Sequence, residues 1–85
     1  MYSSKTSLFR SIVYDLFVSY PTETYSYYVD SINSNHSSSL GRFITLRDLK
    51  TVSYWLSRNG YFKFVRKNSG GVIYLEKICI KPKDY

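Results

Sequence analysis

One stretch, TLRDLKTVSYWLSRNG at residues 45–60, constrains the fold most because it carries every signal of a complete amphipathic helix. Thr45 can cap its start, and Asp48 lies in the first turn, where the helix dipole favours a negative charge. Asn59 and Gly60 can end it, since glycine accepts the left-handed conformation found after many helices. At about 100° per residue, one side forms a stripe expected to face the core, namely Leu46, Leu49, Val52, Ser53 and Leu56.

The opposite side of this predicted helix is basic. It carries three cations, a hydroxyl and a phenol but no acid, and its members are Arg47, Lys50, Thr51, Tyr54 and Arg58. Such a face is either an ordinary solvated surface or a contact surface for nucleic acid. We favour nucleic acid because a second basic segment follows shortly after the helix.

Composition limits the class of protein. A chain of 85 residues forms one small domain with a thin core, so we expect a single domain over residues 1–85. The 12 Lys and Arg side chains outnumber the 6 Asp and Glu, which gives a net charge of +6 and favours an anionic partner. Cys79 is the only cysteine, and no apolar run approaches membrane-spanning length. We therefore expect an intracellular, cytoplasmic protein without membrane contact, in the nucleoid or in a host cell.

Two helices are predicted before the organising stretch. The first is capped by Thr6 or Ser7 and ends before Pro21, with a broad apolar stripe made of Leu8, Phe9, Ile12, Val13, Leu16 and Phe17. The second spans residues 23–33 with Thr22 as its cap, and its apolar side holds Tyr25, Tyr28, Val29 and Ile32. Residues 34–41 should form a mobile loop, and residues 42–44 are a candidate short strand. Residues 1–5 and 82–85 are expected to be frayed tails.

Beyond Gly60 the apolar period changes from that of a helix to that of a strand. Residues 61–67 and 72–81 read as two strands of a hairpin with a turn at residues 68–71. A tip at Ser69 and Gly70 would place Lys63 opposite Glu76, a favourable pair. The same register gathers one apolar face that should pack on the helices, namely Phe62, Phe64, Ile73, Leu75 and Cys79.

The order helix, helix, loop, helix, hairpin resembles a winged-helix (winged helix-turn-helix) DNA-binding domain. The segment that carries the resemblance is residues 51–78, TVSYWLSRNGYFKFVRKNSGGVIYLEKI. The resemblance implies an α+β fold of three helices followed by a two-stranded antiparallel wing. The long connection between the second and third helices departs from the tight turn usual in that family.

The resemblance further implies that the third helix enters the major groove and that the wing touches the backbone or minor groove of DNA. Arg47, Lys50, Thr51, Tyr54 and Arg58 would then face bases and phosphates, since arginine can fork onto guanine and lysine can hold a phosphate. The wing contacts would be Lys63, Arg66, Lys67 and Asn68. The expected function is sequence-specific binding of double-stranded DNA by a small transcriptional regulator, acting as a homodimer on a two-fold site. Its size and composition suit a gene of a virus or plasmid.

Three residues that often carry chemistry have simpler interpretations here. Trp55 is expected at the edge of the core, His36 in solvent, and Cys79 as a small buried apolar residue. The acids are scattered, and no phosphate loop or metal-ligand cluster is present in the sequence. We therefore expect neither an enzyme nor a metal or cofactor.

A second interpretation remains open. The same fold could serve as a protein–protein interaction module that binds no nucleic acid. Its contact patch would be a surface rich in tyrosine, because aromatic anchors dominate such interfaces. The residues concerned are Tyr20, Tyr25, Tyr27, Tyr28 and Tyr54.

Overall fold

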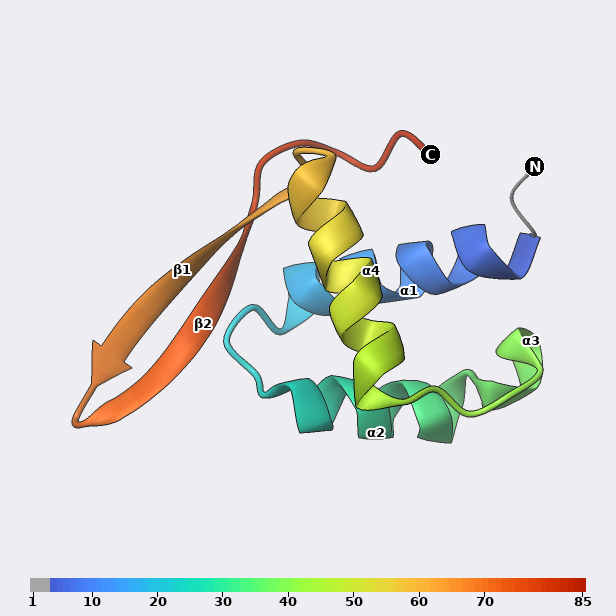
Figure 1. The fold of residues 1–85 in the computed structure, drawn as a ribbon, viewed down its shortest axis with the longest axis horizontal. Helices are drawn as coiled ribbons and strands as arrows, with labels where there is room; N and C mark the ends of the chain where they lie inside the picture. The colour runs from blue at the N-terminus through green and yellow to red at the C-terminus, as the bar shows by residue number, and fades with distance from the viewer. Residues whose placement is uncertain (1–3) are drawn as a thin grey trace.

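The computed structural model describes residues 4–85, which form four helices and one hairpin (Figure 1). In chain order these are α1 (Ser4–Ser19), α2 (Tyr25–Asn35), α3 (Ser37–Leu40), α4 (Leu46–Arg58), β1 (Phe62–Ser69) and β2 (Val72–Cys79). The α+β class and the antiparallel hairpin at the end are confirmed. The helices pack together, and the hairpin projects from one end of them, so the molecule measures 41 × 26 × 20 Å.

The predicted stripe of α1 forms the centre of the core. Phe9, Ile12, Val13 and Phe17 are buried, whereas Leu8 is exposed. The helix begins at Ser4, before the expected caps, so the start of the chain that the structure describes is helical rather than frayed. Residues 1–3 lie outside the described residues. As expected, α1 ends shortly before Pro21, which disfavours helical geometry in the residue ahead of it.

Helix α2 lies two residues further along the chain than predicted. Its cap is Thr24, not Thr22, because the Thr24 hydroxyl accepts the backbone N–H of Tyr27 at 3.1 Å. Tyr28 and Ile32 are buried on the predicted side of the helix. The apolar pattern therefore identified the correct face, while the choice between two neighbouring threonines required the three-dimensional contacts.

The expected mobile loop over residues 34–41 is wrong. The short helix α3 occupies residues 37–40, and Gly41 ends it in the left-handed conformation with φ of 78°. The physical reason is Leu40, the one apolar residue in a serine-rich stretch, which is buried in the core cluster that also contains Phe9. That single anchor gives the segment enough buried apolar surface to adopt a defined course.

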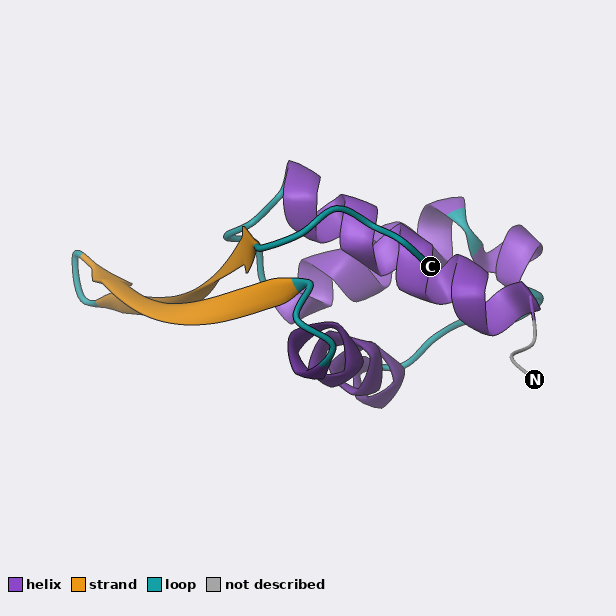
Figure 2. Ribbon diagram, turned by 90° about the horizontal axis from the view of Figure 1, so that it is seen from above, coloured by secondary structure: helices purple, strands orange, loops and turns teal. Residues whose placement is uncertain are grey.

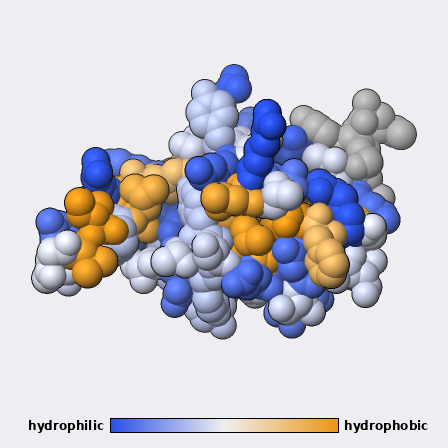
Figure 3. Space-filling model, turned by 60° about the horizontal axis from the view of Figure 1, so that its bottom comes forward, coloured by the Kyte–Doolittle hydropathy of each residue, from blue (hydrophilic) through white to orange (hydrophobic). Residues whose placement is uncertain are grey.

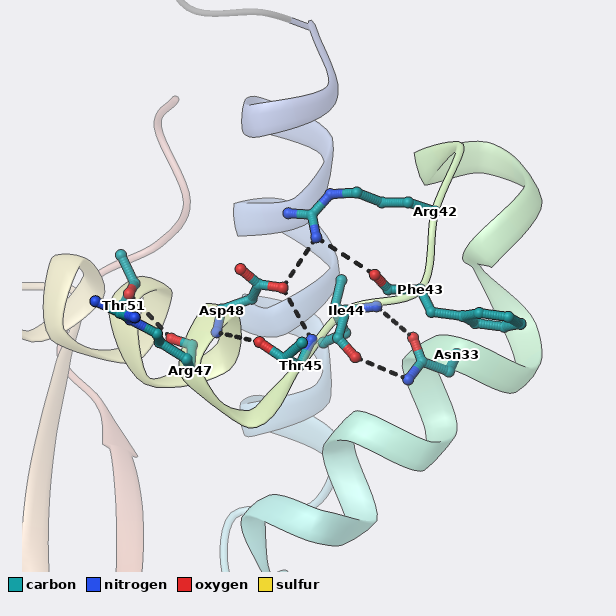
Figure 4. A network of polar contacts seen from close by, with 8 residues as sticks. All are labelled: Asn33, Arg42, Phe43, Ile44, Thr45, Arg47, Asp48 and Thr51. Atoms are coloured by element: carbon teal, nitrogen blue, oxygen red, sulfur yellow. Dashed lines mark hydrogen bonds and ion pairs between the residues drawn. The ribbon is translucent and has the colours of Figure 1, made fainter.

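The candidate strand at residues 42–44 is also wrong, because another group takes up the backbone of Ile44. The Asn33 side chain accepts the Ile44 N–H at 2.7 Å and donates to the Ile44 carbonyl at 3.0 Å (Figure 4). Ile44 therefore has no backbone group left for a sheet. The segment that does touch the hairpin is the connection between α1 and α2, where the Pro21 carbonyl accepts the Lys77 N–H at 2.9 Å.

The hairpin turns one residue later than predicted. Its tip is Gly70 and Gly71, with φ of 58° and 84°, the two positive values that a tight type I′ turn requires. Only glycine adopts both without strain, so the strands pair Ser69 with Val72 and Phe62 with Cys79. The expected opposition of Lys63 and Glu76 is therefore wrong. Glu76 instead pairs across its strand with Val65.

The hairpin face predicted to pack on the helices does so only at its base. Phe62 is buried and Phe64 partly buried, but Ile73 is 57% exposed and Leu75 is 40% exposed. The reason is length, because the outer half of the hairpin extends past the end of the helices (Figure 2). The buried position on β2 belongs to Lys77, whose Nζ donates to the carbonyls of Glu23 at 2.7 Å and Leu75 at 3.0 Å.

Cys79 is exposed rather than buried, which corrects the expectation for this residue. Its Sγ lies 3.2 Å from the hydroxyl of Tyr14, which itself donates to the Lys81 carbonyl at 2.9 Å. The hydrogen bond with the thiol, together with burial, raises the pKa of Tyr14 to about 12. These contacts tie the chain just beyond β2 to α1.

Residues 82–85 are not a frayed tail, because they are held against α1. Lys83 Nζ donates to Ser11 Oγ at 2.6 Å and lies 3.0 Å from a carboxylate oxygen of Asp15. The Tyr85 hydroxyl donates to the Arg10 carbonyl at 2.9 Å, and the Tyr85 ring packs edge-on against neighbouring aromatic rings. The last residues therefore form part of the domain.

Candidate nucleic-acid interface

Helix α4 begins where the sequence predicted, and its first turn is closed by a reciprocal pair of hydrogen bonds. The Asp48 N–H donates to Thr45 Oγ1 at 3.2 Å, and the Thr45 N–H donates to Asp48 Oδ2 at 2.8 Å. This capping box satisfies two backbone donors that a helix start otherwise leaves unpaired. At the far end, Asn59 is the C-cap and Gly60 follows with φ of 78°.

Two residues that the sequence did not single out fix the position of this helix start (Figure 4). Arg42 Nη1 donates to Asp48 Oδ2 at 2.9 Å, and Asn33 on α2 holds the backbone of Ile44, just ahead of the Thr45 cap. Together they attach the first turn of α4 to α2. No local signal reveals them, since an asparagine in a polar helix end and an arginine in a loop are ordinary features of a sequence.

The hydrogen bonds that Asp48 accepts from Arg42 and Thr45 make the stability of the fold depend on pH in a defined direction. Hydrogen bonds from Arg42 and from the Thr45 amide hold the pKa of Asp48 below its ordinary value of 3.8. A lowered carboxyl pKa adds stability that is complete above the unfolded value and is lost as the pH falls through the folded value. We expect Asp48→Asn to flatten the loss of thermal stability between roughly pH 5 and pH 2.

The measurement is the unfolding temperature by circular dichroism across that range, with Asp30→Asn as control, because Asp30 is an exposed acid on α2. Identical acid profiles for Asp48→Asn and the unmodified protein would contradict this prediction.

All five side chains predicted for the basic face of α4 are exposed, and the helix that carries them is unbroken. Within residues 4–85, Arg47, Lys50 and Arg58 make no ion pair. The Arg58 guanidinium lies 5.2 Å from the centre of the Tyr54 ring, and the Thr51 hydroxyl donates to the Arg47 carbonyl at 3.0 Å. The face therefore presents cations with no neutralising acid, beside a tyrosine that is 63% exposed.

The other side of α4 packs on the core, as predicted, except at its first residue. Leu49, Val52, Ser53 and Leu56 are buried, but Leu46 is exposed because it lies at the start of the helix, where the core ends. Trp55 lies at the core edge as expected, stacked at 16° on Tyr61 and covered by the Arg10 guanidinium, whose carbon lies 3.9 Å from the ring centre. This packing directs the basic face outward.

The four residues predicted for the wing are all exposed, but they do not share a face. Alternation along β1 places Lys63 and Lys67 on one side of the hairpin and Arg66 and Asn68 on the other. Lys67 Nζ lies 3.6 Å from a carboxylate oxygen of Glu76, and the Asn68 side chain accepts the Gly71 N–H at 3.2 Å within the turn. Lys63 and Arg66 are therefore the wing cations without an ion pair in the described chain.

The tyrosines of the alternative contact patch do not form one surface. Tyr28 is fully buried, and its hydroxyl donates to the Tyr20 carbonyl, so it cannot anchor a partner. Tyr54 lies apart from the others, on α4. Tyr20 and Tyr27 remain as an exposed edge-to-face pair with ring centres 5.5 Å apart.

Residues 4–85 contain neither a metal-binding cluster nor a membrane-spanning helix. No three His, Cys, Asp or Glu side chains there lie close enough together to hold a metal ion. None of the helices in that range has both the length and the apolar character needed to cross a bilayer. Comparisons of the chain with protein-family models, curated proteins and solved structures found no match.

Proposed function

We propose that this chain is a winged-helix protein that binds double-stranded DNA in a sequence-specific manner, as a small transcriptional regulator acting as a dimer. Helix α4 would lie in the major groove, and the hairpin tip would contact the backbone or minor groove. The observation that carries the proposal is the acid-free, exposed basic face of α4 beside a projecting hairpin that bears further cations.

The chemistry of this face suits duplex DNA. The major groove admits an α-helix, and an arginine near the start of that helix can donate two hydrogen bonds to guanine. Lysine and tyrosine side chains can hold phosphate oxygens on either side of the groove. Arg47 lies in the first turn of α4 and Arg58 at its end, so the face is basic along its length.

The connectivity supports the winged-helix assignment as well. The hairpin follows α4 after three residues, and the base of β2 is joined to the connection between α1 and α2 through the Lys77 and Pro21 hydrogen bond. That bond holds the hairpin beside the helices. A wing needs such a fixed position if it is to contact the DNA backbone next to a helix that lies in the major groove.

A protein–protein interaction module without nucleic acid is the alternative. The exposed pair of Tyr20 and Tyr27 favours it, because paired aromatic rings at a surface are suited to anchoring a partner. Tyr20 directly follows α1 and Tyr27 lies on α2, so neither belongs to the α4 face and mutations can separate the two functions.

The proposal predicts DNA binding that weakens steeply with salt. Each neutralised phosphate contributes about −0.9 to the slope of log affinity against log salt, so several contacts should give a slope of roughly −3 to −6. The experiment selects bound duplexes from a random pool and then measures affinity by fluorescence anisotropy at increasing salt. Tyr20→Ala and Tyr27→Ala should leave the binding unchanged. Absent or salt-independent binding rejects the proposal.

A further inference from the structure

On the outer edge of β2, the side away from β1, the backbone groups of Ile73 and Leu75 are not paired with another strand of the described chain. In an antiparallel hairpin, alternate residues turn their N–H and C=O groups away from the paired strand. Lys77 does so, since its N–H reaches outward to the Pro21 carbonyl, and the same alternation turns the backbone groups of Ile73 and Leu75 outward. Within residues 4–85 no group accepts a hydrogen bond from the N–H of Ile73 or Leu75.

The two edges of the hairpin differ in how they resist pairing. Sheet edges are usually protected by charged side chains, proline or a bulge. Strand β1 carries Lys63, Arg66 and Lys67, so its edge is protected by charge. Residues 72–75 of β2 read Val-Ile-Tyr-Leu, with neither charge nor proline. Apolar surface is visible on the projecting hairpin in Figure 3. On this strand Val72 and Ile73 are both exposed.

Beside this open edge lies a groove. The chain leaves the edge of β2 after Pro21, and the space between residues 22–25 and β2 has a volume of about 430 Å³. Tyr25 and Thr24 line one side of it, while Ile73, Leu75 and Lys77 line the other. An added strand could therefore both hydrogen-bond to the edge and place apolar side chains against Tyr25.

We propose that the occupant is β2 of a second copy of this chain, paired antiparallel about a two-fold axis at Tyr74. Ile73 of each copy would exchange backbone hydrogen bonds with Leu75 of the other, so both outward N–H groups would gain an acceptor. The two hairpins would become one continuous sheet with β2 strands at its centre. A contact of this kind is isologous and closes on itself, so it yields a dimer rather than a filament.

Charge favours the second copy as the partner. In this register Val72 opposes Glu76 of the other copy and Tyr74 opposes its own counterpart, so no like charges face one another. Pairing through β1 would instead set cations against cations, since that strand has Lys63, Arg66 and Lys67 but no acid. The inference rests on the proposed function only for its consequence, which is that two α4 helices would be offered to a two-fold DNA site.

The first test measures the oligomeric state of the full chain by sedimentation equilibrium without DNA. We expect a dimer at micromolar concentration and at least a tenfold weaker dimer for Ile73→Lys, which places a charge at the open edge. Ile80→Lys is the matched control, because Ile80 is 57% exposed like Ile73 but lies just beyond β2, where its N–H donates to the Tyr61 carbonyl. A monomeric unmodified protein, or equal weakening by both variants, overturns the proposal.

The second test examines the register and does not depend on the lysine variants. In a Cys79→Ser background, Tyr74→Cys should give a disulfide-linked dimer on mild oxidation, because the two cysteines would oppose each other across the axis. Glu76→Cys should not, since it would oppose Val72. Absence of the first crosslink, or equal crosslinking of both, overturns the register. A dimer that binds no DNA retains this inference and rejects the proposed function. A DNA-binding monomer rejects this inference and the dimeric form of the regulator, but retains the proposed DNA binding.

Discussion

Arg47→Ala is expected to weaken binding to the selected duplex by about 1–3 kcal/mol and to remove the preference for one base pair, because the proposed guanine contact would be lost. This corresponds to roughly 5- to 150-fold in affinity. Arg47 is the cation in the first turn of α4, is exposed, and is unpaired with any acid in residues 4–85. Arg58→Ala at the other end of the helix should likewise reduce site preference. The measurement is anisotropy on the selected duplex and on single-base variants.

The control for these variants must separate position from net charge. Lys5→Ala removes one positive charge from the start of α1, outside the α4 face. We expect it to lower affinity slightly and equally for all duplexes, as a general charge effect does. If Lys5→Ala and Arg47→Ala reduced affinity and preference alike, the basic face of α4 would not be the site of base contact.

Phe17→Ala is expected to cause the largest loss of stability, about 3–5 kcal/mol, because it removes a fully buried ring that joins three elements. The Phe17 ring centre lies 4.9 Å from that of Tyr28 on α2, and 5.5 Å and 5.9 Å from those of Phe62 and Phe64 on β1. A small domain has only about 5–15 kcal/mol of total stability, so a substantial part of it would be lost.

The measurement is the midpoint of urea and thermal unfolding, where a decrease of roughly 12–40 °C is expected for a domain of this size. Val18→Ala, at the next position of α1, is the control. Its side chain is half exposed, so its effect should stay within about 0.5 kcal/mol. A small effect of Phe17→Ala, similar to that of Val18→Ala, would mean that the hairpin base is not held by this aromatic cluster.

Helix α4 shows how much of this fold the sequence alone could predict. Its boundaries follow from Thr45, Asp48, Asn59 and Gly60, which act on backbone groups only a few residues away, and its two faces follow from the apolar period, except at Leu46. The class of the fold and the antiparallel hairpin were predictable for the same reason. Interactions of this range are encoded in neighbouring residues, so a single sequence suffices to identify them.

The hairpin shows where local information was almost enough. The alternation of β1 and β2 correctly predicted which residues share a face, but two adjacent glycines following a serine allow more than one tip. The choice fell on Gly70 and Gly71 because both central positions of the turn need a positive φ. Alternation also gives no information on where the helices end, so it could not show that Ile73 and Leu75 lie beyond them.

The sequence by itself determined the helix that presents the basic face, the signs of charge on it and the order of the three longer helices and the hairpin. Only the tertiary structure decided that Asn33 holds Ile44, that Leu40 orders a serine-rich stretch, that Tyr28 is buried and that the last residues pack on α1. Each of those outcomes depends on a partner many residues away or on a shared core. Their free energies arise from contacts that exist only once the chain has folded.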